Sequence, residues 1–231
     1  MTNPEGIRSR LADIRARVDA ACRAAARSPA DVTLIAVSKT HPPESIRAAY
    51  EAGQRDFGEN YAQELVRKRE ALSDLPDLRW HFIGALQSNK AKMVTPGCVL
   101  VHAIDRDSVG EAISRRAQQA GVTQELLVEV NVGDEASKAG VVIDDAAALI
   151  DRLRALPSIS VRGLMCIPPP AENETDARRY FARLRTLRDE LRSGRAGLDL
   201  LSMGMSGDFE AAIAEGATHV RVGTAIFGSR D

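Results

Sequence analysis

Apolar residues recur along the chain in two alternating patterns, one typical of helices and one typical of buried strands. Between residues 7 and 18 they return every three or four positions, behind Asn3 and Pro4, which suit an N-cap and a first helical turn. We therefore expect an amphipathic helix there. Residues 32–37 are apolar almost throughout, as expected for a parallel strand that is covered on both faces.

The two patterns continue to alternate to the end of the chain. Clear strand segments cover residues 79–83, 99–104, 125–132, 161–167, 198–203 and 219–227. Residues 54–58 have weak strand propensity, and we include them because a strand is needed between the helices expected near residues 43–52 and 61–72. The eight strands and their helices predict an α/β fold, a (β/α)8 TIM barrel forming a single domain over residues 1–231, with the N-terminal helix completing the outer ring. An open, doubly wound sheet is the alternative.

Composition and charge narrow the class of protein. The chain has 231 residues, 44% of them hydrophobic, and its 31 Lys and Arg residues are mixed with 32 Asp and Glu residues, so a nucleic-acid partner is not expected. No segment approaches the roughly 18 apolar residues of a membrane span, and no secretory signal is recognisable. Cys22, Cys98 and Cys166 are isolated and fit free thiols in a reducing compartment, so we expect a cytoplasmic protein.

Polar residues follow the expected strands at the end of the barrel where such folds build their sites. Lys39 comes directly after the first strand, where partial desolvation lowers the pKa of an amine and favours its attack on an aldehyde. A solvated surface lysine is the alternative. Arg221 is flanked by apolar residues, and its side chain either enters the barrel mouth or extends outward along the surface.

Two segments near the C-terminus suggest a site for phosphate. We expect a helix to begin at Ser206 and Gly207, with Ser206 as its N-cap, and to run to about residue 215. Gly223 and Thr224 at the end of the last strand add an N–H donor and a hydroxyl group, and the loops after the last two strands commonly bind phosphate in TIM barrels. Ordinary capping is the alternative. No nucleotide-binding glycine loop is present, and the histidines and cysteines lack metal-ligand spacing, so we expect neither a nucleotide nor a metal.

Several motifs in combination resemble the pyridoxal phosphate homeostasis proteins, over nearly the whole chain. They are residues 36–40 (AVSKT), 57–61 (FGENY), 80–84 (WHFIG), 86–90 (LQSNK), 129–132 (EVNV), 138–140 (KAG), 163–165 (GLM), 202–206 (SMGMS) and 220–228 (VRVGTAIFG). This family resembles the barrel domain of alanine racemases. The resemblance implies pyridoxal 5'-phosphate (PLP) bound as a Schiff base to Lys39. The residues expected to bind this cofactor are Lys39, Asn60, His81, Met203, Ser206, Gly207, Arg221, Gly223 and Thr224.

The resemblance also bears on whether the chain is an enzyme. It implies phosphate contacts from Ser206, Gly223 and Thr224 and places Arg221 near the pyridine ring, where an arginine opposes ring protonation and weakens the ring as an electron sink. We do not expect the separate domain that supplies a second base in alanine racemases. We therefore expect a protein that carries PLP in vitamin B6 homeostasis, with PLP-dependent apo-enzymes as recipients, and the resemblance implies a monomer.

Three alternatives to carriage stay open at this point. They are an amino-acid racemase, an aldolase that uses Lys39 on a phosphorylated sugar, and a barrel without a ligand. Lys138, in the loop after the fifth strand, is either solvated or helps to take up or release the cofactor, and the roles of Lys90 and Lys92 stay open.

Overall fold

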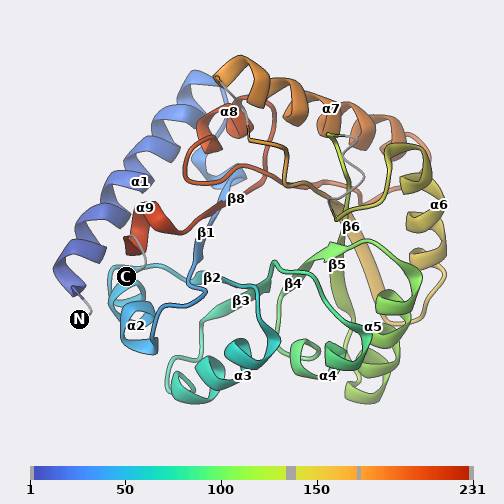
Figure 1. The fold of residues 1–231 in the computed structure, drawn as a ribbon, viewed down its shortest axis with the longest axis horizontal. Helices are drawn as coiled ribbons and strands as arrows, with labels where there is room; N and C mark the ends of the chain where they lie inside the picture. The colour runs from blue at the N-terminus through green and yellow to red at the C-terminus, as the bar shows by residue number, and fades with distance from the viewer. Residues whose placement is uncertain (1–2, 134–138, 171–172, 229–231) are drawn as a thin grey trace.

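The computed structural model describes residues 3–133, 139–170 and 173–228, and its centre is a closed barrel of eight parallel strands in sequence order (Figure 1). The strands are β1 (Thr33–Val37), β2 (Asp56–Glu59), β3 (Arg79–Phe82), β4 (Leu100–Ile104), β5 (Gln124–Glu129), β6 (Ile159–Met165), β7 (Leu200–Ser202) and β8 (His219–Val222). The barrel closes where β1 pairs with β8, with Thr33 opposite His219. The predicted TIM barrel is thus confirmed, and the open sheet is excluded.

Helices surround the barrel on all sides (Figure 1). They are α1 (Pro4–Ala24), α2 (Pro43–Glu51), α3 (Ala62–Ala71), α4 (Ala91–Val94), α5 (Asp107–Ala120), α6 (Ile143–Arg154), α7 (Glu174–Arg192), α8 (Phe209–Ala214) and α9 (Thr224–Phe227), with 3-10 turns η1 (Pro29–Asp31) and η2 (Ser88–Lys90). Asn3 caps α1 as expected, because its side chain accepts the Gly6 N–H at 2.9 Å. Helix α1 packs against α2, α8 and α9, so it completes the outer ring.

The weakest of the expected strands, β2, forms with its two neighbours. It pairs with β1 and β3, and all four of its residues are buried. The expected last strand is too long by five residues, because the chain leaves the barrel at Gly223 and residues 224–227 form α9. Ser206 is not the N-cap of the following helix, which begins at Phe209 with Asp208 as N-cap. The Asp208 carboxylate accepts the Met205 N–H at 2.5 Å and holds a turn ahead of the helix.

The barrel has two kinds of interior. The main hydrophobic core lies between strands and helices, and a small apolar cluster of Leu100, Ala103, Leu127 and Met165 comes from β4, β5 and β6. Elsewhere the strands bring buried polar side chains together. His102 on β4 contacts Ser202 on β7 at 2.8 Å, and since these strands are not neighbours, the contact crosses the inside of the barrel.

Two further sequence expectations can be compared with the structure. Cys22, Cys98 and Cys166 are buried and unpaired. Among the residues described, no helix has both the length and the apolar character needed to cross a membrane.

Candidate functional site

A cavity of about 300 Å³ opens at the carboxyl ends of the strands. Its size lies at the lower end of the range of small-molecule sites, roughly 300–1,000 Å³. The described residues that line it are Val37, Lys39, His41, Asn60, Ile83, Ile167, Met205, Ser206, Gly207, Arg221, Gly223 and Thr224. Seven of the nine residues expected from the sequence are therefore brought together here.

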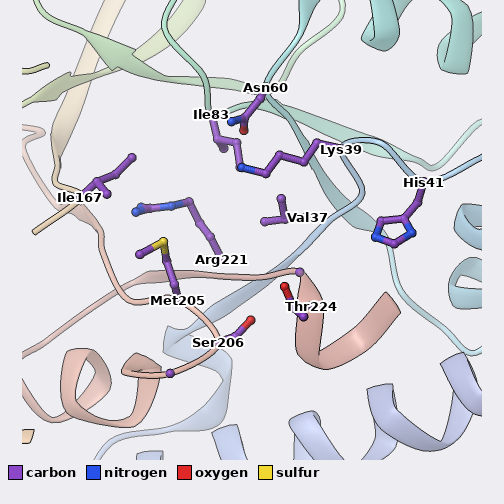
Figure 2. A pocket seen from close by; sticks show the side chains of 12 residues that line it. Val37, Lys39, His41, Asn60, Ile83, Ile167, Met205, Ser206, Arg221 and Thr224 are labelled. Atoms are coloured by element: carbon purple, nitrogen blue, oxygen red, sulfur yellow. The ribbon is translucent and has the colours of Figure 1, made fainter. Parts of the chain in front are cut away.

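Lys39 lies in the turn directly after β1, and hydrogen bonds fix the backbone on both sides of it. The Ser38 N–H donates to the Gly58 carbonyl at 3.0 Å, and the Thr40 N–H donates to the Glu64 carboxylate at 2.7 Å. Thr40 has a φ of 68°, a left-handed conformation that is uncommon for a β-branched residue. Figure 2 shows the Lys39 side chain extended along one side of the cavity, beneath Asn60 and toward Ile83.

A buried ionic network stabilises the turn that carries Lys39. The Lys68 ammonium donates to the Ser38 carbonyl and to the Glu59 carboxylate, each at 2.7 Å, and forms a further ion pair with Glu64. The Ser38 hydroxyl also donates to Glu59, at 2.6 Å. Burial raises the pKa of Glu59, and the Lys68 charge opposes that shift. Sequence patterns gave no sign of this network, because a lysine in an amphipathic helix is usually solvated.

The opposite side of the cavity presents hydrogen-bond donors. Figure 2 shows the hydroxyl groups of Ser206 and Thr224 turned toward one another at this edge. The first internal hydrogen bond of α9 runs from the Ile226 N–H to the Gly223 carbonyl, so the N–H groups ahead of it are available at the helix start. None of the described lining residues is acidic. Hydroxyl and N–H donors in a lining without a carboxylate suit an anion such as phosphate, and the neighbouring Asp208 carboxylate accepts the Met205 N–H.

Arg221 lies between these two sides and enters the barrel mouth, which resolves the two orientations left open by the sequence (Figure 2). Its guanidinium donates to the Ser202 hydroxyl at 2.6 Å and to the Cys166 carbonyl at 2.9 Å. Burial lowers the pKa of Arg221. Glu129, at the end of β5, is also buried, and desolvation followed by the charge of Asp105 raises its pKa to about 7.

Two residues expected at the cavity lie elsewhere. The placement of His81 at the mouth is wrong, since it is 3% exposed inside the barrel and contacts Asp56 and His102. Met203 is likewise wrongly placed, because it is fully buried in the main core. Gly204 follows it with a φ of 91°, and this turn brings Met205 to the cavity instead. Lys90 lies in η2 away from the lining residues, and Lys138 lies outside the described residues.

Some cavity residues were missed by the sequence analysis. His41, Ile83 and Ile167 line the cavity, and the His41 ring stacks on Phe227 with centroids 5.0 Å apart. Each of these residues lies at or just past the carboxyl end of a strand, and this position was the signal by which the sequence could have identified them.

Known proteins include relatives whose sequences match this chain over nearly its whole length. Residues 10–231 match the family described as alanine racemase, N-terminal domain. A pyridoxal phosphate homeostasis protein from Aquifex aeolicus is 48% identical over 222 residues, covering 96% of this chain and 97% of that protein. A protein of the same name from Pseudomonas aeruginosa is 47% identical over 225 residues, covering 97% and 96% of the two chains.

Solved structures agree with these sequence matches. The structure of PipY from Synechococcus elongatus with PLP bound has a TM-score of 0.84 and 40% identity, covering 96% of this chain and all of that one. Alanine racemase from Corynebacterium glutamicum is only 15% identical with a TM-score of 0.72, and this chain covers 63% of it, so that likeness concerns the fold alone. Since close to half of its residues are identical to those of the two homeostasis proteins over nearly their full length, this chain belongs to the family of pyridoxal phosphate homeostasis proteins.

Proposed function

We propose that this chain binds PLP as a Schiff base on Lys39 and serves to hold and carry this cofactor in vitamin B6 homeostasis. The observation that carries the proposal is the order of groups along one cavity. An amine lies at one side, a buried guanidinium lies in the middle, and a cluster of hydroxyl and N–H donors lies at the other side. PLP has an aldehyde, a pyridine ring and a phosphate in a matching arrangement, and the bound cofactor supplies an electrophilic carbonyl and an electron-withdrawing ring.

Each side of the cavity then has a role. Lys39 attaches the aldehyde, and Ser206, Gly207, Gly223 and Thr224 hold the phosphate through hydroxyl and N–H groups. Arg221 meets the ring nitrogen. The side-chain amide oxygen (Oδ1) of Asn60 is buried without a hydrogen-bond partner in the described part of the chain, so Asn60 has polar capacity left for a ligand.

Carriage is favoured over catalysis by the chemistry of Arg221. A guanidinium is a donor only, so the ring nitrogen that it meets must accept a hydrogen bond and stay unprotonated. An unprotonated ring is a weak electron sink, which slows carbanion chemistry on the cofactor. The names of the relatives point the same way, since they refer to homeostasis and not to a reaction. A racemase-like enzyme is the second candidate, favoured only by the shared barrel.

The proposal extends to the setting of the protein. Free, buried thiols suit a reducing compartment, so we place the protein in the cytoplasm, acting as a monomer that passes PLP to apo-enzymes. Sedimentation of the purified protein tests the monomer, and a dimer at micromolar concentration would contradict it.

Turnover and transfer assays separate the two candidates. The PLP-loaded protein is incubated with each amino acid, and its enantiomers and products are measured over time. In parallel, activation of a PLP-dependent apo-enzyme is compared with activation by free PLP. We expect no sustained turnover and an efficient transfer to the apo-enzyme. Steady interconversion of any amino acid would contradict carriage and favour the racemase.

A further inference from the structure

Five buried side chains form a continuous series of hydrogen bonds through the barrel. Asp56 contacts His81 at 3.0 Å, His81 contacts His102 at 3.0 Å, His102 contacts Ser202 at 2.8 Å, and Ser202 contacts Arg221 at 2.6 Å. They come from β2, β3, β4, β7 and β8. We call this series the interior relay. It leads from the amino-terminal end of β2 to the guanidinium that lines the cavity.

When both imidazole rings are neutral, one direction of hydrogen bonding satisfies Asp56, which only accepts, and Arg221, which only donates. Arg221 can only donate, so its partner Ser202 accepts and has its own proton left to donate to Nδ1 of His102. A neutral His102 then carries its proton on Nε2 and donates to Nδ1 of His81, whose Nε2 proton goes to the Asp56 carboxylate. Arg221, Ser202, His102 and His81 each donate once along the relay, and the Asp56 carboxylate only accepts. No two donors and no two acceptors face one another.

The physical state of the members agrees with this direction. Burial holds the pKa of His102 well below its ordinary value, which keeps the ring neutral and limits it to one N–H. Hydrogen bonds from Arg79 and His81 outweigh burial at Asp56 and lower its pKa to about 2, so its carboxylate stays charged. In the described part of the chain Arg221 forms no ion pair with a carboxylate, and the charges of Glu129 and Asp208 act on it without direct contact. The interior relay thus connects this buried cation to a distant anion.

We propose that His81, His102 and Ser202 are positioning residues that orient Arg221 toward the bound ring and, through the charge of Asp56, set its strength as a hydrogen-bond donor. This inference rests on the proposed PLP site. In a series of aligned hydrogen bonds each bond polarises the next, and the low dielectric of the barrel interior preserves the effect over several links. The state of the ring would then depend on residues that never touch it.

The direction of the relay can be measured without cofactor. In the PLP-free protein, 15N NMR of the histidine side chains distinguishes protonated from unprotonated ring nitrogens, and His219→Gln assigns the remaining buried ring. We expect Nε2 protonated and Nδ1 unprotonated in both His81 and His102. A proton on Nδ1 of His102 would overturn the assigned direction, whatever happens to PLP.

Serine variants test the effect of the relay on the cofactor. In Ser202→Ala we expect the Schiff-base absorption band to move and PLP binding to weaken about tenfold, as for the loss of one hydrogen bond to a charged group. Ser202→Thr keeps the hydroxyl and should restore both. Ser114→Ala is the matched control, since Ser114 is also buried and hydrogen-bonded but lies on α5. If Ser202→Ala and Ser114→Ala gave the same band and affinity, the proposal would fail.

A second variant covers the case in which Ser202→Ala does not fold. Asp56→Asn keeps an acceptor for His81 and removes the charge, together with one of the two oxygens that accept from Arg79. We expect a shifted band with the Schiff base still present. An unchanged band in Asp56→Asn would refute the role of the charge, while the band itself would leave the Lys39 assignment standing. If the wild type formed no Schiff base at all, the proposed function would fail, and the NMR result would still decide the direction of the relay.

Discussion

The network beneath Lys39 makes a sharp prediction for Lys68→Met. Methionine fills a similar volume but removes the cation that contacts the Ser38 carbonyl and the Glu59 carboxylate, each at 2.7 Å. Glu59 is fully buried and would keep only the Ser38 hydroxyl as a partner. Breaking one side of a buried ion pair costs about 3–5 kcal/mol, because the remaining charge is uncompensated. We expect a loss of that size in the free energy of unfolding, measured with urea on the PLP-free protein.

The stability loss of Lys68→Met should also depend on pH, in a direction that follows from the pKa of Glu59. Burial already raises the pKa of Glu59, and loss of Lys68 raises it further. A carboxyl with a higher pKa in the folded state binds more protons there, so stability is greatest below the unfolded pKa and falls as the pH rises. The deficit of Lys68→Met should therefore grow as the pH rises above 4.5, the ordinary pKa of a glutamate.

Two further variants control this experiment. Lys92→Met alters an exposed lysine on α4 and should change stability by less than about 0.5 kcal/mol. Adding Glu59→Gln to Lys68→Met removes the uncompensated buried charge and should restore much of the lost free energy of unfolding. If Lys68→Met unfolds with the same free energy as Lys92→Met at every pH, the network does not support the Lys39 turn.

Three other predictions concern the cavity and its surroundings. Ser206→Ala combined with Thr224→Val should weaken PLP binding about tenfold or more and affect pyridoxal, which lacks the phosphate, far less; equal losses in a titration would contradict the phosphate assignment. Glu129 has a pKa of about 7 in place of its ordinary 4.5, so wild-type stability should fall as the pH rises between these values, and Glu129→Gln should remove that fall. A matching pH profile for the variant would refute this. In Gly84→Ala the new Cβ would clash with the backbone carbonyl oxygen of Asn60, so we expect a loss of roughly 1–3 kcal/mol in the free energy of unfolding, with Gly194→Ala as the unobstructed control.

The barrel itself could be predicted because its strands are covered on both faces and read as apolar runs. β2 is the instructive exception, since its residues Asp56 and Glu59 are charged yet buried. Their charges are compensated by Arg79 and Lys68, which come from other elements. The spacing between the two flanking helices predicted this strand, whereas its amino-acid composition did not.

Much of the cavity could also be predicted, because the ends of parallel strands meet at one mouth. The errors arose where the local geometry departs from a simple strand. Alternation along β3 directs the His81 side chain inward but does not tell its height in the barrel, and the left-handed turn at Gly204 exchanges Met203 for Met205. The relay partners of His81 come from distant strands, so no local pattern could reveal them.

The central claim is the attachment of PLP to Lys39, and the visible absorption spectrum tests it most directly. The spectrum is recorded for the wild type, Lys39→Ala and Lys92→Ala, each with and without added PLP. We predict a yellow Schiff-base band that borohydride bleaches, present in the wild type and Lys92→Ala and absent from Lys39→Ala. A wild type without this band at excess PLP, or a Lys39→Ala variant that retains it, would contradict the account.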